Sequence, residues 1–457
     1  MSSTTPSPRQ LRRAIITGAI GGALEYYDFA LYGLASALVF GQLFFPSLGP
    51  TGALLASFAT YGAGFLARPF GGLFFGSLGD RKGRKLVLLL TIGLMGLATT
   101  AIGLLPTGPV GAVLLVALRL LQGFGAGAEQ SGATTLMSEL APKHRRGLYA
   151  ALPFMGIFAG LALATITFRI LQMTLTPEEI LAWGWRIPFL ASVVLIAMAI
   201  WIRLKLKESP VFENLAAHHA VDHAPMRAVL TEARRPLAAT ILMRLSEQGS
   251  STLYATVAIA FLTGFVAPRT GVTGLGAVGT NAVLWASLAS VLTTPLFGAL
   301  SDRIGRLKVY RAGALFAAAW AFPAWWMLST GNQALAVIAI FGGFAIGANS
   351  MLGAQCAHFT ELFGNRYRYS GVALSREVGA LLSGGIAPLL GVFLLSRVDG
   401  GYWVMALYTL VLALATLAGT WLSVETRDRE LTDLHDAIGQ GADHSQRYNP
   451  LGKPAAP

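Results

Sequence analysis

Charged side chains stand inside several long apolar segments of the sequence. Glu25 and Asp28 occur in the first such segment, Arg68 in the second and Arg119 in the fourth. At a rise of about 1.5 Å per helical residue, each would lie near the middle of a hydrocarbon layer about 30 Å thick. An ionisable side chain at that depth costs about 2.5–3.5 kcal/mol on insertion scales, so each is a candidate functional residue.

A buried carboxylate beside a guanidinium can couple proton binding to anion binding. Low dielectric favours the protonated acid, whereas a neighbouring arginine favours the charged form. If an anion recruits the arginine, the carboxylate takes up a proton, and the two binding events become linked. We expect Asp28 or Glu25 to act in this way with Arg119; the alternative is a permanent ion pair that fixes helix packing. Glu247 and Glu129 are further proton-binding candidates, and Glu129 could equally contact substrate or pair without moving.

The buried arginines also predict contact with a carboxylate. A guanidinium offers a planar fork that matches a carboxylate and stays charged at any working pH. For Arg244 the alternatives are a pair with Glu247 on the same helical face, or a side chain that snorkels to the surface. Tyrosines near the buried charges could line a cavity, although aromatic residues in spans more often pack or anchor. The candidate substrate-binding residues are Arg119, Arg68, Arg244, Gln122, Tyr27 and Tyr254.

Arg376 and Glu377 occur near the start of the eleventh apolar segment. Long charged side chains at that depth reach the membrane surface while their stems stay in the apolar layer. We therefore interpret them as a snorkelling pair.

The composition indicates that these segments cross a membrane. Of 457 residues, 54% are hydrophobic and only 12% are charged, whereas a soluble chain carries about a quarter charged residues. A span needs roughly 20 residues, so the apolar residues suffice for about twelve helices, which pair their own backbone in lipid. The predicted spans are 14–40, 52–79, 86–105, 110–138, 148–172, 187–206, 237–266, 275–300, 309–329, 333–361, 371–395 and 402–423.

The net charge of +12 predicts an orientation. Most of the 34 lysines and arginines fall in alternate connections and in the terminal segments, which the positive-inside rule assigns to the cytoplasm with both termini. Nucleic acid is excluded as a partner, because the cations form short runs between apolar segments instead of a polar basic face. The single cysteine, Cys356, allows neither a disulfide within the chain nor a cysteine metal cluster.

An internal repeat divides the chain into two parallel halves. The segment GSLGDRKGR at 76–84 recurs as GALSDRIGR at 298–306, and the same offset relates Glu25 to Glu247 and Arg146 to Arg368. Parallel repeats imply a substrate site between the halves, near the membrane midplane. We predict two six-helix bundles at 1–204 and 236–423, a cytoplasmic linker at 205–235, and a cytoplasmic tail at 424–457 to which we assign no chemistry.

Six motifs together resemble those of one transporter family. They are LEYYDFALYG (24–33), ARPFGG (67–72), GSLGDRKGRK (76–85), RLLQGFGAGAEQSG (119–132), WGWRIPF (183–189) and ELFGNRYRYSG (361–371). They resemble the major facilitator superfamily and, within it, the metabolite:proton symporter family. The stretches MRLSEQ (243–248) and RYRYSG (366–371) are most similar to the shikimate-transporter branch.

The resemblance implies an all-α membrane protein of twelve transmembrane helices, and a transporter instead of an enzyme. It implies proton-driven import of a small organic anion, such as a shikimate-like or Krebs-cycle acid, by a monomer without a cofactor in the bacterial inner membrane. It also implies a cytoplasmic gate, whose acids and arginines join in one state and separate in the other. The implied gate residues are Asp80, Arg81, Arg84, Glu139, Arg146, Asp302, Arg303, Arg306, Glu361 and Arg368.

Two departures from the family pattern leave the substrate open. Tyr26 stands where the family commonly has tryptophan, and Gln130 and Ser131 replace a tryptophan and a glycine in the fourth span. A zwitterion symporter for proline or betaine is therefore an alternative. A drug or cation:proton antiporter of the same fold is another, although the buried arginines argue against it. A membrane sensor would need a larger cytoplasmic domain than 205–235 or 424–457 provides.

Overall fold

The computed structural model describes residues 8–82, 84–127, 129–204, 229–364, 367–431 and 435–438. Within these residues the regular structure is entirely helical. Several long helices contain a short π-helical stretch, a feature that is frequent at functional sites.

The first half of the chain begins with a long helix that continues through a π-helical stretch. Its helices are α1 (Pro8–Ala35), η1 (Ser36–Phe40), α2 (Gly41–Phe44), η2 (Pro46–Leu48), α3 (Gly49–Lys82), α4 (Arg84–Ile102), α5 (Pro109–Ala126), α6 (Glu129–Leu140), η3 (Lys143–Arg145), α7 (Arg146–Ala151), α8 (Phe154–Thr174), α9 (Pro177–Glu179), η4 (Ile180–Gly184) and α10 (Arg186–Leu204).

The second half also consists of long helices that continue through π-helical stretches. Its helices are α13 (Arg234–Thr252), η5 (Leu253–Val257), α14 (Ala258–Phe261), η6 (Leu262–Val266), α15 (Ala267–Thr270), α16 (Leu275–Ile304), α17 (Arg306–Ser329), α18 (Gln333–Phe341), η7 (Gly342–Ala348), α19 (Asn349–Leu362), α20 (Arg368–Ala380), η9 (Leu381–Gly385), α21 (Ile386–Arg397) and α22 (Tyr402–Leu422).

Helix boundaries recur between the halves at the offset of the sequence repeat. Helix α7 begins at Arg146 and α20 at Arg368, while α6 ends at Leu140 and α19 at Leu362. The repeated motifs therefore lie at equivalent helix ends.

Long apolar helices account for most of the described residues. Nine are long and apolar enough to cross a membrane, or ten if the bent pair Pro177–Gly184 and Arg186–Met198 forms one span, and Leu89–Ile102 is a shorter apolar helix. Large apolar side chains face outward, including Leu97, Val113 and Trp421, each more than 70% exposed. Such an apolar surface is unfavourable in water and favourable in contact with lipid. The count of twelve spans stays a prediction.

Small residues let neighbouring helices of the first half approach closely. A Cβ atom on Gly123 of α5 would lie 1.9 Å from the carbonyl oxygen of Gly64 on α3. A Cβ atom on Gly156 of α8 would lie 1.8 Å from the carbonyl oxygen of Ala19 on α1. Glycine is required at both positions, as is common where transmembrane helices pack.

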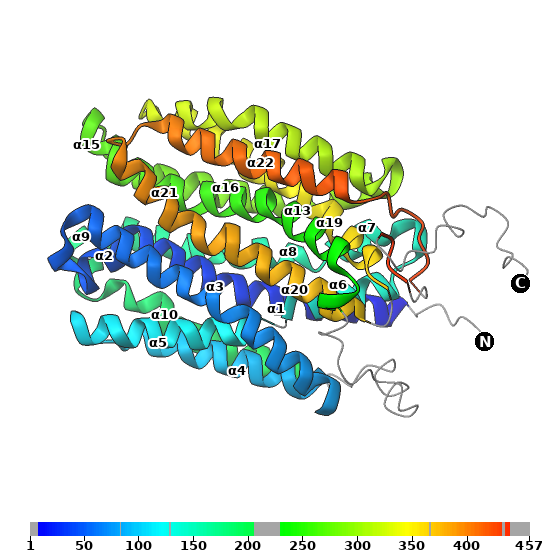
Figure 1. Ribbon diagram of the computed structural model, residues 1–457. Helices are drawn as coiled ribbons and strands as arrows, with labels where there is room; N and C mark the ends of the chain where they lie inside the picture. The colour runs from blue at the N-terminus through cyan, green and yellow to red at the C-terminus, as the bar shows by residue number, and fades with distance from the viewer. Residues whose placement is uncertain are drawn as a thin grey trace, which may run out of the picture.

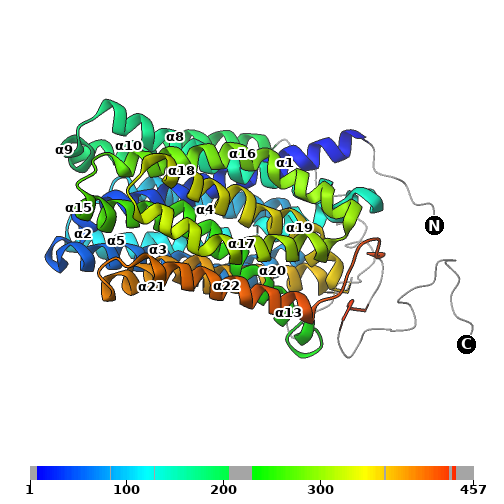
Figure 2. The same ribbon diagram turned by 90° about the horizontal axis from the view of Figure 1, so that it is seen from above.

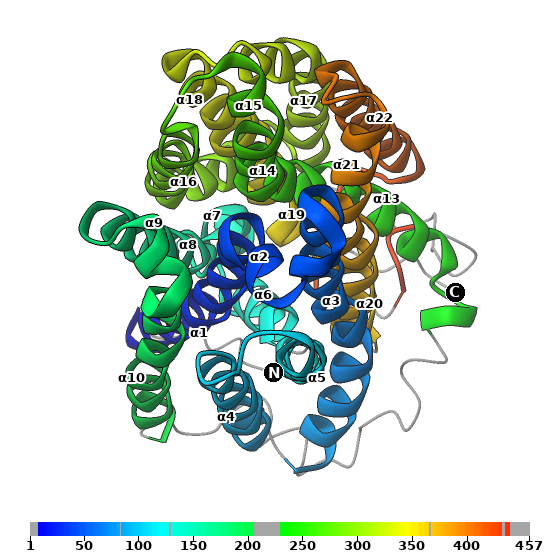
Figure 3. The ribbon, with the colours of Figure 1, turned by 90° about the vertical axis from the view of Figure 1, so that its left-hand side faces the viewer.

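The helices run side by side along one direction (Figures 1 and 2). Helices α2, α9 and α15 mark one end of the bundle, and α6 and α7 lie toward the opposite end, which we call the α7 end. Seen along the bundle, α16, α17, α18 and α22 lie on one side, and α4, α5 and α10 on the other (Figure 3). Between the halves, α16 packs against α7 and α8, and α3 packs against α20 and α21. The pairs Arg68–Glu377 and Arg376–Gln130 lie across this junction.

Candidate functional site

An arginine of the first half binds a carboxylate from each half. Arg68 on α3 donates from Nη2 to Glu25 Oε1 on α1 at 2.9 Å. Its Nε donates to Glu377 Oε2 on α20 at 2.6 Å. All three side chains are buried. This arginine therefore joins the two halves through a pair of buried carboxylates.

The interpretation of Arg376 and Glu377 as a snorkelling pair is wrong. Both side chains are buried, at 2% and 3% exposure, and both bind groups on the opposite half. Helix α20 begins at Arg368, so these residues lie about 12–14 Å along the helix at 1.5 Å per residue. Neither was a candidate site residue from the sequence.

Two glutamines, one from each half, connect the buried charges further. Gln130 on α6 donates to Glu25 at 2.8 Å and accepts from Arg376 Nη2 at 2.7 Å. Gln355 on α19 accepts from Arg376 Nη1 at 2.9 Å and from Arg244 Nη1 at 2.8 Å. One signal could have identified each glutamine, because each is an uncharged polar residue inside an apolar segment.

Arg244 and Glu247 pair with each other on α13. Their ion pair spans one helical turn, and both side chains are buried. The Gln355 amide also contacts Glu247 at 3.3 Å and the Tyr310 hydroxyl at 3.0 Å. A pair with Glu247 was one of the alternatives that we considered for Arg244 from the sequence.

Asp28 and Arg119 are linked through two neutral side chains. Thr99 donates to Asp28 Oδ2 at 2.7 Å, and Gln122 donates to Thr99 Oγ1 at 2.7 Å. Gln122 in turn accepts from Arg119 Nη1. Ser192 makes a longer contact to Asp28, at 3.5 Å. The expected acid and arginine thus belong to one hydrogen-bonded chain without a direct ion pair in the described part of the structure.

Aromatic rings surround the Arg119 guanidinium. Its Cζ atom lies 4.2 Å from the ring centroids of Phe29 and Tyr32, and 5.1 Å from that of Tyr61. Cation–π attraction partly replaces the lost hydration of the charge. Among the described residues, two of its nitrogens, Nε and Nη2, are buried without a hydrogen-bond partner. Arg119 therefore retains unused capacity to bind an anion.

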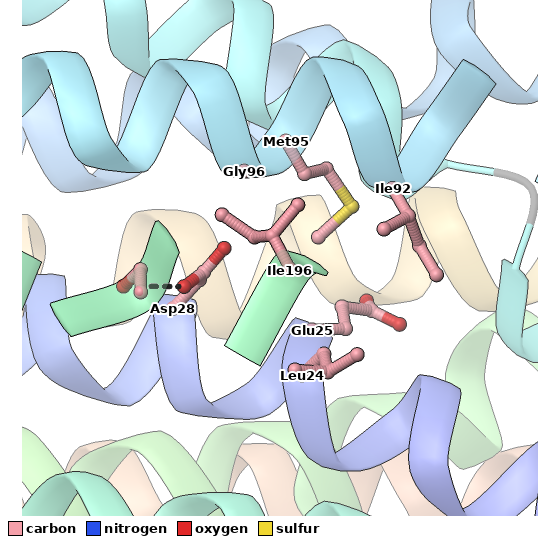
Figure 4. Close-up of a pocket in the computed structure, with 8 residues that line it drawn as sticks. Leu24, Glu25, Asp28, Ile92, Met95, Gly96 and Ile196 are labelled. Atoms are coloured by element: carbon pink, nitrogen blue, oxygen red, sulfur yellow. Dashed lines mark hydrogen bonds between the residues drawn. The ribbon is translucent and has the colours of Figure 1, made fainter. Parts of the chain in front are cut away.

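Glu25 and Asp28 line one small cavity among α1, α4 and α10. Figure 4 shows both carboxylates on the same face of α1, toward α4. Apolar side chains, including Met95 and Ile196, form most of the remaining wall. The two proton-binding candidates of the first span thus line the same pocket.

The remaining central candidates differ in their surroundings. The Tyr27 hydroxyl donates to the Pro188 carbonyl at 3.0 Å. Tyr254 stacks on Trp325 with ring centroids 5.8 Å apart, and its hydroxyl is buried without a hydrogen-bond partner among the described residues. The side chain of Glu129 lies outside the described residues.

Ion pairs join the halves at the α7 end. Arg146 Nη1 binds Glu361 Oε1 at 2.9 Å, and Arg306 Nε binds Glu361 Oε2 at 3.2 Å. Arg306 also binds Asp302 at 2.6 Å. Asp302 accepts from the backbone nitrogens of Gly147 and Leu148 at 2.8 and 2.9 Å. Most of the predicted gate residues of the second half thus converge on the start of α7.

The other gate residues are less closely placed. Glu139 and Arg368 lie 3.8 Å apart across the halves. The backbone carbonyl of Arg303 accepts from Arg427 Nη1 at 2.6 Å. The side chains of Asp80, Arg81 and Arg84 lie outside the described residues.

The segment after α22, to which we assigned no chemistry, contacts the gate residues at the α7 end. Thr426 donates to Glu361 Oε2 at 2.8 Å. Glu425 accepts from the backbone nitrogens of Arg306 and Leu307 at 2.9 and 3.1 Å. Burial opposes the charged form of Glu425, but backbone hydrogen bonds, led by that from Arg306, lower its pKa overall. Sequence reasoning missed this role because a short polar segment carries no motif for it.

Comparison with known proteins gives consistent matches over nearly the whole chain. The sequence model described as sugar (and other) transporter matches residues 14–224 and 229–437. The shikimate transporter of Escherichia coli K12 is 37% identical over 412 residues, which cover 89% of this chain and 93% of the relative. The proline/betaine transporter of Salmonella typhimurium LT2 is 28% identical over 438 residues, covering 92% and 85%. The resemblance predicted from the motifs is confirmed.

A solved structure gives independent support for the fold. The structure of the proton:xylose symporter XylE, of the major facilitator superfamily, matches with a TM-score of 0.71. The match covers 93% of this chain and 98% of that one, at 16% sequence identity. At that identity the likeness shows the fold alone.

Proposed function

Because the chain belongs to the sugar (and other) transporter family of the major facilitator superfamily, we propose that it is a proton-coupled symporter of a small organic anion. The substrate is a mono- or dicarboxylate, such as a shikimate-like or Krebs-cycle-type acid. Import proceeds by alternating access in the bacterial inner membrane, with the α7 end in the cytoplasm, and a single chain is the functional unit.

The balance of the buried central charges supports anion symport most directly. In the described part of the chain, four buried arginines of the central region are matched by four buried carboxylates: Arg68, Arg119, Arg244 and Arg376 with Glu25, Asp28, Glu247 and Glu377. An uncompensated charge in a low-dielectric interior is costly. A monoanion that enters this region adds one negative charge, and one proton on a carboxylate restores neutrality. Anion and proton therefore enter together.

Asp28 is the proton site in this proposal. Protonation removes the negative charge of Asp28. The Thr99 hydroxyl stabilises this charge directly, and Gln122 and Arg119 stabilise it through Thr99. Arg119 then turns its buried, unpartnered nitrogens to a substrate anion. Each event favours the other by linkage.

Alternating access follows from the ties between the halves. The bonds of Glu361 to Arg146 and Arg306 hold the α7 end closed. On the other side of the central charges, Gly62 of α3 approaches Gly385 so closely that a Cβ atom would lie 3.0 Å from the Gly385 carbonyl oxygen. Rocking of the halves about the central site exchanges contacts at the two ends.

Uptake into proteoliposomes tests the proposed function. The purified protein is reconstituted, a pH gradient is imposed, and uptake of labelled shikimate, 2-oxoglutarate, citrate, glycine betaine and a lipophilic cation is compared. We expect accumulation of one of the acids when the outside is acidic. Accumulation of the cation when the inside is acidic would instead support a cation:proton antiporter.

A zwitterion is the second candidate substrate. The relationship to the proline/betaine transporter favours it, and a betaine also carries the carboxylate that the buried arginines would bind. A quaternary ammonium prefers aromatic faces, and Arg119 already occupies those of Phe29 and Tyr32. Preferential uptake of glycine betaine in the same assay would favour this candidate.

A further inference from the structure

Arg376 differs from Arg68 and Arg244 in its partners. Arg68 and Arg244 each bind a buried carboxylate. Within the described residues, no ion pair joins Arg376 to a carboxylate. It donates instead to the amide oxygens of Gln130 and Gln355, at 2.7 and 2.9 Å. A buried guanidinium ordinarily needs a carboxylate, because neutral dipoles replace only part of its lost hydration.

The unsatisfied part of Arg376 is buried with the rest of the side chain. The residue is 2% exposed, and its Nε atom has no hydrogen-bond partner in the part of the chain that the structure describes. Its Cζ atom lies 5.1 Å from the ring centroid of Phe154, which provides an apolar wall beside the charge. A cation, an unused donor and an apolar wall meet at one point between the halves.

Both glutamines can accept from the arginine or donate to an anion. A carboxamide carries an acceptor oxygen and a donor nitrogen, and a turn of the amide exchanges them. Gln130 comes from the first half and Gln355 from the second. A carboxylate at Arg376 could therefore receive hydrogen bonds from the arginine and from both halves.

We propose that Arg376, in addition to Arg119, is a receptor for a substrate carboxylate, with Gln130 and Gln355 as neutral partners that the carboxylate displaces. This inference rests on the proposed anion transport and deepens it, because it names a further residue that recognises the charged group. The direct tie between Arg376 and Gln130 crosses the halves. Its replacement by a substrate carboxylate makes the ligand itself the bridge, so that loading the site alters the contact between the halves.

The test compares Arg376→Gln, Arg376→Lys and a control, Arg311→Gln, in the full-length protein in proteoliposomes. Arg311 lies on α17 and binds Thr420, remote from the central charges. KM is measured for the acid of the panel that the wild type transports, and inhibition is measured for its neutral carboxamide. Since a hydrogen bond to a charged group contributes enough to change affinity about 10- to 100-fold, we expect Arg376→Gln to raise KM by that factor.

Two further readouts distinguish recognition from folding. Arg376→Gln should keep the wild-type melting temperature without ligand but lose the rise that the acid produces, and it should discriminate less between acid and carboxamide. Arg376→Lys should recover part of the affinity, because it keeps the charge without the fork. An unchanged KM and acid preference in Arg376→Gln overturns the inference alone. If the wild type transports none of the acids, the proposed function fails first, and the inference fails with it.

Discussion

Arg68 and Glu377 form a buried ion pair of 2.6 Å that joins the first half of the chain to the second. Glu25 binds the same guanidinium at 2.9 Å. In the alternating access that we propose, the halves stay in contact at this depth while both ends move. The pair would then have a structural and a mechanistic role, and the two can be separated by measurement.

A double-mutant cycle on this pair should show strong coupling. Glu377→Gln leaves Arg68 with one carboxylate, and breaking a buried pair costs about 3–5 kcal/mol. We expect a cost near the lower end, since Glu25 remains, and we expect the double variant with Arg68→Gln to be less destabilised than the sum. Thermal unfolding in detergent measures each term.

The exposed pair Arg427 and Asp428 provides the matched control for that cycle. The side chains of these residues are 40% and 51% exposed, and they lie 3.1 Å apart. Exposed pairs contribute about 0–1 kcal/mol. Equal coupling in the two cycles would contradict a special role for Arg68 and Glu377.

Gly64 is predicted to be essential because Arg119 occupies the space beside it. A Cβ atom at this position would lie 2.5 Å from Arg119 Nε. Overpacking of this kind costs about 1–3 kcal/mol, so we expect Gly64→Ala to displace the guanidinium and reduce uptake about tenfold or more. Gly93→Ala is the control, because nothing lies within 4 Å of its added Cβ. Similar uptake by the two variants would show that the position of Arg119 is not critical.

Glu361→Gln should open the α7 end. Without that carboxylate, Arg146 and Arg306 keep their buried positive charges but lose the acid between them. We expect faster hydrogen exchange at the start of α7 and of α17, which begin at Arg146 and Arg306, by about tenfold if the change costs 1.4 kcal/mol. Glu430→Gln, which removes an exposed pair with Lys143, should leave that exchange unchanged. Unaltered exchange in Glu361→Gln would mean that other contacts hold the end closed.

The contact between the tail and the start of α17 should depend on pH. The pKa of Glu425 is lowered below its ordinary value of 4.5, so its stabilising contribution is complete above that value and is lost as pH falls below it. A spin label at Asp428→Cys, with Cys356→Ala as background, should be immobile at pH 7 and become mobile under acid. With Glu425→Gln added, the label should already be mobile at pH 7. Mobility that does not change with pH in the parent would rule out this titration.

Several features could be predicted from the sequence because they depend on local pattern. Apolar length predicted the helices, and the sequence repeat that relates Arg146 to Arg368 recurs in the structure as equivalent helix starts. The motifs predicted the family. The burial of Arg68 and Arg119 also followed from their place inside apolar segments.

The partners of the charges could not be predicted, because pairing depends on which helix faces meet in three dimensions. Periodicity placed Arg244 and Glu247 on one face, and these two do pair. No local pattern indicates that α3 faces α20, so Glu377 as the partner of Arg68 was missed. Thr99 between Asp28 and Gln122 was missed for the same reason, since a threonine in an apolar helix ordinarily bonds its own backbone.

In the proposed mechanism, anion and proton enter together, and Asp28 carries the proton. Proteoliposomes that contain a pH-sensitive dye are mixed with the transported acid in the absence of an imposed gradient, and protein-free liposomes correct for passive entry. We predict acidification of the lumen with wild-type protein and none with Asp28→Asn, which should still exchange labelled for unlabelled acid across the membrane. Uptake of the acid by the wild type without acidification of the lumen would contradict the account.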